Sequence, residues 1–268
     1  MANNLDAVGI FDSGVGGLTV HRRVAERLPR ESIVYLGDTA RVPYGAKSAD
    51  TVIRYARACS AILVQRGIKL LVVACNTASA YALDALRGEL DIPVLGVIEP
   101  GAEKAALATR NGRIGVIGTV GTIQSGQYQR TIQTHAQDAR VFAKACPLFV
   151  PLAEEGWTDG PVPEQVAHTY LRELLDQGID TLVLGCTHYP LLKTTIARVA
   201  GGEVALIDSA EAVSAAVRHS LDERGLSRRA AEPGSRTFLV TDSPEDFVRV
   251  GRRFLEEPIS EVEWVELR

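Results

Sequence analysis

The chain has 268 residues, of which 46% are hydrophobic and 23% are charged, with a formal net charge of −4. These proportions are typical of a folded protein with a buried core, and they exclude a disordered, collagen-like or disulfide-framework chain. No basic block is present, so the charge pattern gives no support for nucleic acid or an anionic membrane as a partner. At about 150 residues per domain, the length favours two domains or one large one.

The first residues of the chain and its cysteines indicate the cellular compartment. Residues 1–6 have neither a basic n-region nor an apolar h-region, and the longest apolar runs are far shorter than the roughly 18 residues of a membrane span. We therefore expect a soluble, cytoplasmic protein. The four cysteines are far apart and form no CxxC pair or zinc-site spacing with histidine, so we expect free thiols and no metal.

Short β-branched apolar runs alternate with amphipathic stretches, a pattern typical of a parallel sheet flanked by helices. The predicted strands, in chain order, are residues 8–11, 33–36, 70–74, 94–98, 113–117, 181–184, 204–207 and 237–241. Helices are expected between them, most clearly over 49–66 and 163–177, each of which is followed by a glycine suited to a helix end. Ser243-Pro244-Glu245 is typical of a helix start.

The sequence contains a weak internal repeat. Residues 8–16 (VGIFDSGVG) resemble residues 114–121 (IGVIGTVG), each an apolar strand followed by small and hydroxyl-bearing residues. Residues 71–77 (LVVACNT) resemble residues 182–188 (LVLGCTH) in the same way. Ser13 precedes Cys75 by 62 residues, and Thr119 precedes Cys186 by 67. Such patterns also recur by chance in α/β proteins, but two related α/β units are the simplest interpretation.

Cys75 and Cys186 each follow a predicted strand, at the sheet edge where open α/β folds bind ligands. Each precedes residues that can cap a helix or hold an anion: Asn76 and Thr77 in one case, Thr187 in the other. A thiol there gains thiolate character from the helix dipole. A single such cysteine is more often a buried hydrophobe. Two in matching settings favour chemistry: thiols on opposite faces of a carbon could remove a proton from one face and return one to the other.

Polar residues at neighbouring strand ends are candidates for tuning these thiols. They are Asp12, Glu154 and His188. Each also has a structural interpretation: Asp12 as a helix cap, His188 as a structural histidine, and Glu154 with Glu155 as a solvated pair on a loop.

Other motifs carry less weight. The glycine-rich run after Ser13 lacks the third glycine of a dinucleotide fingerprint, and no GxxxxGK[ST] loop is present, so NAD and nucleoside triphosphates are not expected. The loop around Tyr44 and Gly45 could approach a ligand closely or be a simple turn. Cys59 and Cys146 are interpreted as buried structural residues.

With these residues together, the sequence resembles the glutamate racemases of the aspartate/glutamate racemase family, cofactor-independent enzymes of bacterial cell-wall synthesis. The run CTHYPLL, at residues 186–192, separates this group from the aspartate racemases. The matching segments span nearly the whole chain in order: GIFDSGVGGLTV (9–20), YLGDTARVPYG (35–45), ACNTAS (74–79), GVIEPG (96–101), IGTVGTIQSGQY (117–128) and LGCTHYPLL (184–192).

The resemblance implies an α/β fold of two pseudo-symmetric domains, each a mostly parallel sheet flanked by helices, with the active site in the cleft between them. The expected bounds are 1–98 with 210–268 for the first domain, and 99–209 for the second. Some relatives carry an N-terminal extension linked to activation by a cell-wall precursor. Asp12 lies only eleven residues from the start, so neither the extension nor the dependence is expected.

The resemblance also implies the reaction: interconversion of L- and D-glutamate by two bases, without pyridoxal phosphate, metal or other cofactor. Cys75 matches the cysteine that acts on D-glutamate, and Cys186 the one that acts on L-glutamate. Asp12 and His188 match residues that assist the thiols, and Glu154, chosen over Glu155, looks like the acid near the second thiol. Substrate contacts carry over to Asp12, Ser13, Tyr44, Gly45, Asn76, Thr77, Thr187 and His188, and Thr119 and Thr122 match a motif that could touch a carboxylate.

None of the matched residues is Lys or Arg. A dicarboxylic substrate must then be held by backbone N–H groups, hydroxyls and helix N-termini in a small closed cavity that excludes water, with domain motion gating turnover. The expected partner is the substrate glutamate, and neither nucleic acid nor a membrane is expected. The sequence does not decide between a monomer and a homodimer. An aspartate-type racemase, a non-catalytic amino-acid-binding module and a thiol oxidoreductase are the alternatives.

Overall fold

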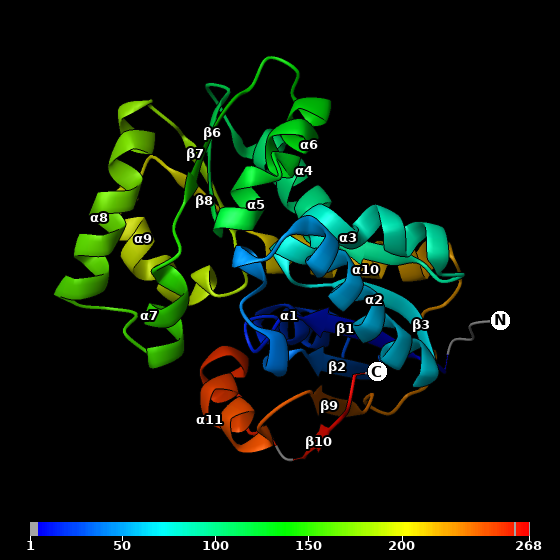
Figure 1. The fold of residues 1–268 in the computed structure, drawn as a ribbon. Helices are drawn as coiled ribbons and strands as arrows, with labels where there is room; N and C mark the ends of the chain where they lie inside the picture. Colours follow the sequence, from blue (N-terminus) through cyan, green and yellow to red (C-terminus); the bar gives the residue numbers. More distant parts are fainter. Residues whose placement is uncertain (1–4, 260, 268) are drawn as a thin grey trace.

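The computed structural model describes residues 5–259 and 261–267, and within them the strands form two separate sheets (Figure 1). The larger sheet contains β1 (Ala7–Asp12), β2 (Ile33–Gly37), β3 (Ile68–Val73), β4 (Val94–Gly96), β9 (Arg236–Val240) and β10 (Val262–Trp264). The smaller contains β5 (Arg113–Gly118), β6 (Arg140–Ala145), β7 (Thr181–Gly185) and β8 (Ala205–Asp208). Every neighbouring pair is parallel.

The two sheets repeat one strand order. The larger runs β10-β9-β2-β1-β3-β4 and the smaller β6-β5-β7-β8. When β1 is matched to β5, the next strand along the chain lies on one side of it, and the third and fourth lie on the other. This doubled unit confirms the predicted α/β fold of two similar halves, to which β9 and β10 add a C-terminal return onto the first sheet.

Helices cover both faces of each sheet (Figure 1). The first sheet has α1 (Leu18–Arg27), α10 (Ser209–Glu223) and α11 (Pro244–Leu255) on one face, and α2 (Ala49–Gln65) and α3 (Asn76–Glu89) on the other. The second has α8 (Pro161–Asp176) and α9 (Lys193–Ala200) on one face, and α4 (Ile98–Ala108) and α6 (Gln127–His135) on the other. Shorter helices occupy the connections: η1 (Thr39–Arg41), η2 (Tyr44–Ala46), α5 (Val120–Gln124), α7 (Phe149–Glu155) and η3 (Tyr189–Leu192).

None of the described helices combines the length and the apolar character that a membrane crossing requires.

The eight predicted strands are all present, most of them shifted or extended by one or two residues. The strand expected over 94–98 ends at Gly96, because Ile98 already begins α4. The predicted helix 163–177 begins earlier, at Pro161. The sequence misses β6 and β10. Both are edge strands with partly exposed, charged residues, and such strands lack the apolar run by which buried parallel strands are recognised.

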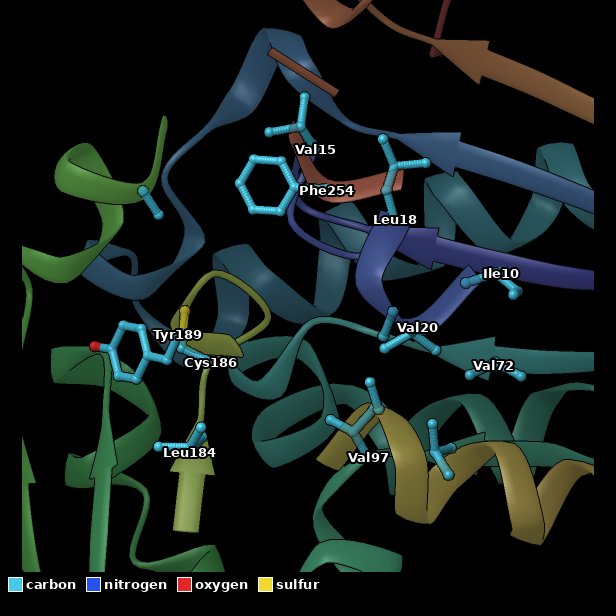
Figure 2. Close-up of a cluster of buried hydrophobic side chains, with 14 of the residues drawn as sticks. Ile10, Val15, Leu18, Val20, Val72, Val97, Leu184, Cys186, Tyr189 and Phe254 are labelled. Atoms are coloured by element: carbon cyan, nitrogen blue, oxygen red, sulfur yellow. The ribbon is translucent and has the colours of Figure 1, made fainter. Parts of the chain in front are cut away.

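Alternate side chains of the first sheet enter two different cores. Ile10 and Val72 belong to the cluster with α1, whereas Phe11 packs on the opposite face with α2 and α3. The first of these clusters extends into the second half of the molecule. Figure 2 shows Ile10 and Val72 at one end of it and Leu184, Tyr189 and Cys186 at the other. The two halves therefore share one hydrophobic cluster, which extends as far as Cys186.

A buried ion pair attaches the C-terminal return to the first half. Lys69 in β3 is fully buried, and its Nζ lies 2.6 Å from Glu31 Oε2. The same ammonium donates to the carbonyl of Leu226, at 2.8 Å, in the segment that connects α10 to β9. Because both charges are out of water, each depends on the other for its stabilisation.

Replacing Lys69 by alanine should lower the free energy of unfolding by about 3–5 kcal/mol, since the Glu31 carboxylate would stay buried without its cation. Urea denaturation followed by circular dichroism measures this. The matched control is Arg57→Ala, which removes the partner of Glu89 in an exposed pair and should change stability little. Equal effects of the two substitutions would show that the buried pair does not hold the return segment.

Candidate active site

A cavity of about 230 Å³ lies where the C-terminal strand ends of the two halves face each other. That volume is below the roughly 300–1,000 Å³ of pockets for drug-sized ligands, which favours a small metabolite. Both halves of the chain line it. The lining residues are Ser13, Gly14, Val42, Pro43, Tyr44, Gly45, Ala46, Cys75, Asn76, Thr77, Thr119, Val120, Pro147, Val150, Pro151, Glu154, Cys186, Thr187 and His188.

The structure thus brings together the site residues predicted from the sequence except Asp12 and Thr122, which do not line the cavity. Asp12 lies behind the cavity wall, fully buried, and its Oδ2 accepts a hydrogen bond from the Gly14 N–H at 2.9 Å. Its Oδ1 has no hydrogen-bond partner among the described residues. Burial raises the pKa of this carboxyl, although the charge of His188 and the backbone N–H groups of Gly17, Gly14 and Ser13 act in the opposite direction.

Cys75 joins β3 to α3. It caps the N-terminus of the helix, where its Sγ accepts from the Ala78 N–H at 3.5 Å. Burial, together with the charge of Asp12, raises the pKa of this thiol to about 12, against the hydrogen bonds from Ser13 and Ala78. Cys75 is therefore a thiol at neutral pH. The thiolate character expected from the helix N-terminus is wrong for this residue, because desolvation outweighs the local donors.

Cys186 follows β7 at the equivalent place in the second half, but its partners differ. Its Sγ lies 3.9 Å from Nδ1 of His188, whose Nε2 lies 3.0 Å from Glu154 Oε1. Burial alone would lower the pKa of His188, but the hydrogen bonds with Cys186 and Glu154 raise it to about 10. His188 is therefore an imidazolium at neutral pH. Phe254 of α11 packs edge-on against its ring, with the centroids 5.1 Å apart.

Glu154 lies in a helix where the sequence predicts a loop. Pro151 occupies the first turn of α7, where its missing N–H costs no hydrogen bond, and Gly156 ends the helix with a positive φ of 78°. Glu154 is partly exposed and faces the cavity, whereas Glu155 is exposed to solvent. The carbonyl of Glu154 also accepts a hydrogen bond from Arg253 of α11.

The loop after β1 touches the second half directly. A Cβ on Gly16 would lie 2.3 Å from Thr187 Oγ1, so only glycine allows this approach. Thr19 Oγ1 donates to the Thr187 carbonyl at 3.1 Å. The glycine-rich run therefore serves close packing between the halves.

Hydroxyl groups from both halves meet at another wall of the cavity. Thr77 Oγ1 lies 2.9 Å from Thr119 Oγ1 and 3.1 Å from Thr122 Oγ1. Asn76, at the N-terminus of α3, has a buried Nδ2 with no hydrogen-bond partner among the described residues. Among the described residues, no Lys or Arg lines the cavity, so the donors available to an anion there are the His188 imidazolium, neutral groups and the helix N-terminus.

The family model described as Asp/Glu/Hydantoin racemase matches residues 18–217. A glutamate racemase from Geobacter metallireducens is 56% identical over 261 residues, which cover 97% of this chain and 97% of that relative. The chain belongs to the Asp/Glu/Hydantoin racemase family. Its fold matches the crystal structure of a glutamate racemase from Bacillus anthracis with a TM-score of 0.95, at 40% identity and 99% coverage of both chains. A glutamate racemase from Francisella tularensis in complex with D-glutamate matches with a TM-score of 0.92, at 37% identity and 98% coverage of both chains.

One wall of this family member's cavity has no counterpart in the sequence-based prediction. Pro147 lies between β6 and α7, and Val150 and Pro151 lie in α7 itself; the sequence predicts neither the strand nor the helix. The adjacent Cys146 lies outside the lining, as its structural interpretation requires. Among the described residues, no group of three or more His, Cys, Asp or Glu side chains is arranged to hold a metal ion.

Substituting Glu154 by glutamine should lower the pKa of His188 from about 10, because the imidazolium loses a charged acceptor. Its pKa lies above the ordinary 6.5, so the stabilisation from this pair is complete below pH 6.5 and is lost as the pH rises through 10. The difference in unfolding free energy between wild type and Glu154→Gln should therefore shrink over that range. NMR titration of labelled histidine measures the pKa, with Glu155→Gln as control; an unchanged His188 titration in Glu154→Gln would contradict the assignment.

Proposed function

We propose that this chain interconverts L- and D-glutamate without a cofactor and so supplies D-glutamate for peptidoglycan synthesis in the cytoplasm. The observation that carries the proposal is that Cys75 and Cys186, which follow equivalent strands of the two halves, line one small cavity. The glutamate racemases among the relatives support the choice of substrate.

In the L-to-D direction, Cys186 in its thiolate form removes the α-proton of L-glutamate and becomes a thiol. The electron pair left on the α-carbon is delocalised into the adjacent carboxylate. Cys75, which burial keeps as a thiol, then donates its proton to the opposite face of that carbon, giving D-glutamate and a Cys75 thiolate. The reverse reaction begins from this second state, so the two sulfurs exchange the roles of base and acid.

The residues beside the two sulfurs suit these roles. The His188 imidazolium lies 3.9 Å from Cys186 Sγ and stabilises negative charge on that sulfur. Asp12 is buried near Cys75 and takes part in its proton exchange. Glu154 keeps His188 protonated. The residues that line the cavity and contact the substrate are Ser13, Tyr44, Gly45, Asn76, Thr77, Thr187 and His188, and Thr119 is available for a carboxylate. Asp12 and Thr122 lie outside the lining, so their predicted substrate contacts would be indirect.

Neutral donors are sufficient for a dicarboxylate only where water is excluded, because their fields are strongest in a low dielectric. We therefore assign two domains that close around the substrate: residues 1–98 with 210–268, and residues 99–209. The polar contacts that join them, among them Thr77 with Thr119 beside the cavity and Tyr81 with the Gly121 carbonyl at 2.8 Å, would break when the halves open during turnover. Residues 1–4, on which the expected absence of an extension depends, lie outside the described residues, as do 260 and 268.

A homodimer completes the proposal. Leu148 and Trp157 expose 53% and 57% of their surface, and a second copy of the chain would cover them, since most oligomers of soluble proteins are symmetric homo-oligomers. Sedimentation equilibrium should give twice the mass of one chain, and the mass of a single chain at micromolar concentration would contradict the dimer.

In deuterated water, the enzyme should convert L-glutamate to D-glutamate that carries deuterium at the α-carbon, measured by circular dichroism and mass spectrometry. Cys75→Ala and Cys186→Ala should each lower kcat/KM by about 10²–10⁴-fold or more, because each removes a general acid–base group. Cys59→Ala and Cys146→Ala remove buried thiols outside the cavity and should retain activity.

Other results would select another function. Full activity in both Cys75→Ala and Cys186→Ala would exclude the two-thiol mechanism. Calorimetric binding of glutamate without isotope exchange would indicate an amino-acid-binding module, and faster racemisation of aspartate would indicate an aspartate-type enzyme. A mass loss of two protons on oxidation, reversed by reductant, would indicate a Cys75–Cys186 disulfide and a thiol oxidoreductase.

A further inference from the structure

Tyr128 connects the two halves at the active-site cavity without lining it. It lies in α6, beside the second sheet, and is 1% exposed. Its hydroxyl donates to Oδ1 of Asn76 at 2.7 Å, and Asn76 belongs to α3 beside the first sheet. Oδ1 and Nδ2 of an amide lie on opposite sides of the group, so a hydrogen bond that holds Oδ1 also fixes the direction of Nδ2.

The Nδ2 of Asn76 is the end of that amide left for a ligand. It is buried and has no hydrogen-bond partner among the described residues, and Asn76 lines the cavity. A buried donor without a partner is costly, and a substrate carboxylate would satisfy it. If the amide were rotated, its carbonyl oxygen would face the carboxylate instead and repel it.

The Tyr128 hydroxyl also lies where the chain passes between the halves. It is hydrogen-bonded by Ser209, the first residue of α10. A Cβ built on Gly101, in α4, would lie 3.5 Å from the Tyr128 hydroxyl oxygen and 3.6 Å from Ser209 Cβ. The chain passes from the first half to the second at α4 and returns at α10. The Tyr128 hydroxyl therefore lies beside both connections, and it is hydrogen-bonded to Asn76, which lines the cavity.

We infer that Tyr128 is a positioning residue: in the closed arrangement its hydroxyl orients the Asn76 amide so that Nδ2 donates to a carboxylate of the substrate. The inference rests on the proposed function. Tyr128 and Asn76 belong to different halves, so the amide is oriented only when the halves are together. The donor for the carboxylate is thereby made dependent on closure.

The test is a double-mutant cycle on glutamate racemisation. Tyr128→Phe removes only the hydroxyl. It should raise KM by about tenfold, which corresponds to the loss of the hydrogen bond between Asn76 Nδ2 and the charged substrate carboxylate, and it should leave kcat within about twofold. Asn76→Ala should raise KM by at least as much. Because Tyr128 acts through Asn76, adding Tyr128→Phe to Asn76→Ala should change KM no further.

The matched control is Tyr81→Phe. The Tyr81 hydroxyl also crosses between the halves, to the Gly121 carbonyl at 2.8 Å, but neither residue lines the cavity. It should leave KM within about twofold, because this hydrogen bond orients no residue of the cavity lining. Urea denaturation of each variant separates a loss of stability from a change in KM.

Three results would overturn the inference: a wild-type KM in Tyr128→Phe, additive effects in the double mutant, or an equal rise of KM in Tyr81→Phe. If Tyr128→Phe fails to fold, Asn76→Asp is the second test, because this variant keeps an oxygen that accepts from Tyr128 but loses the Nδ2 donor. An unchanged KM in Asn76→Asp would overturn the inference. Failure of the proposed function is distinct, since wild type itself would then not racemise glutamate.

Discussion

Burial is the constraint on which the chemistry of both sulfurs depends. It raises the pKa of the Cys75 thiol to about 12 and opposes the protonation of His188, whose pKa is nevertheless raised to about 10 by hydrogen bonds with Cys186 and Glu154. The described part of the cavity contains threonine hydroxyls, an amide, a helix N-terminus and the His188 imidazolium in place of lysine or arginine, and such donors act most strongly where water is excluded. A more open cavity would weaken these interactions together.

The two sulfurs occupy equivalent places but have different partners. Each follows the third strand of its four-strand unit, and both line one cavity, to which each half contributes one of them. The residues around the two sulfurs differ between the halves: Cys75 lies near the carboxyl of Asp12, and Cys186 lies near the His188 imidazolium. The repeated backbone accounts for the equivalent positions, and the differing side chains raise the pKa of one thiol and place the other beside a cation.

The sequence predicts the buried strands, from their apolar runs, and the polar residues that come directly after them. Cys75, Cys186 and His188 belong to this class, because the carboxyl ends of parallel strands meet at one edge of a sheet. The strand β6 escapes prediction because an edge strand needs no continuous apolar run. The high pKa of Cys75 escapes it for a different reason: the extent of desolvation depends on how the two halves pack, which local sequence does not contain.

Tyr128 illustrates the same limit within a recognised motif. It ends the segment that resembles the racemases at residues 117–128, yet its partners Asn76 and Ser209 lie far away along the chain, and nothing local distinguishes its ring from an ordinary core tyrosine. Contacts of this kind form only after both units have folded and come together. A cavity made by two separately folded halves must therefore depend on residues outside its wall to align them. The two cysteines of the cavity can be found from a repeat in the sequence, whereas a contact such as that of Tyr128 with Asn76 has to be found in three dimensions.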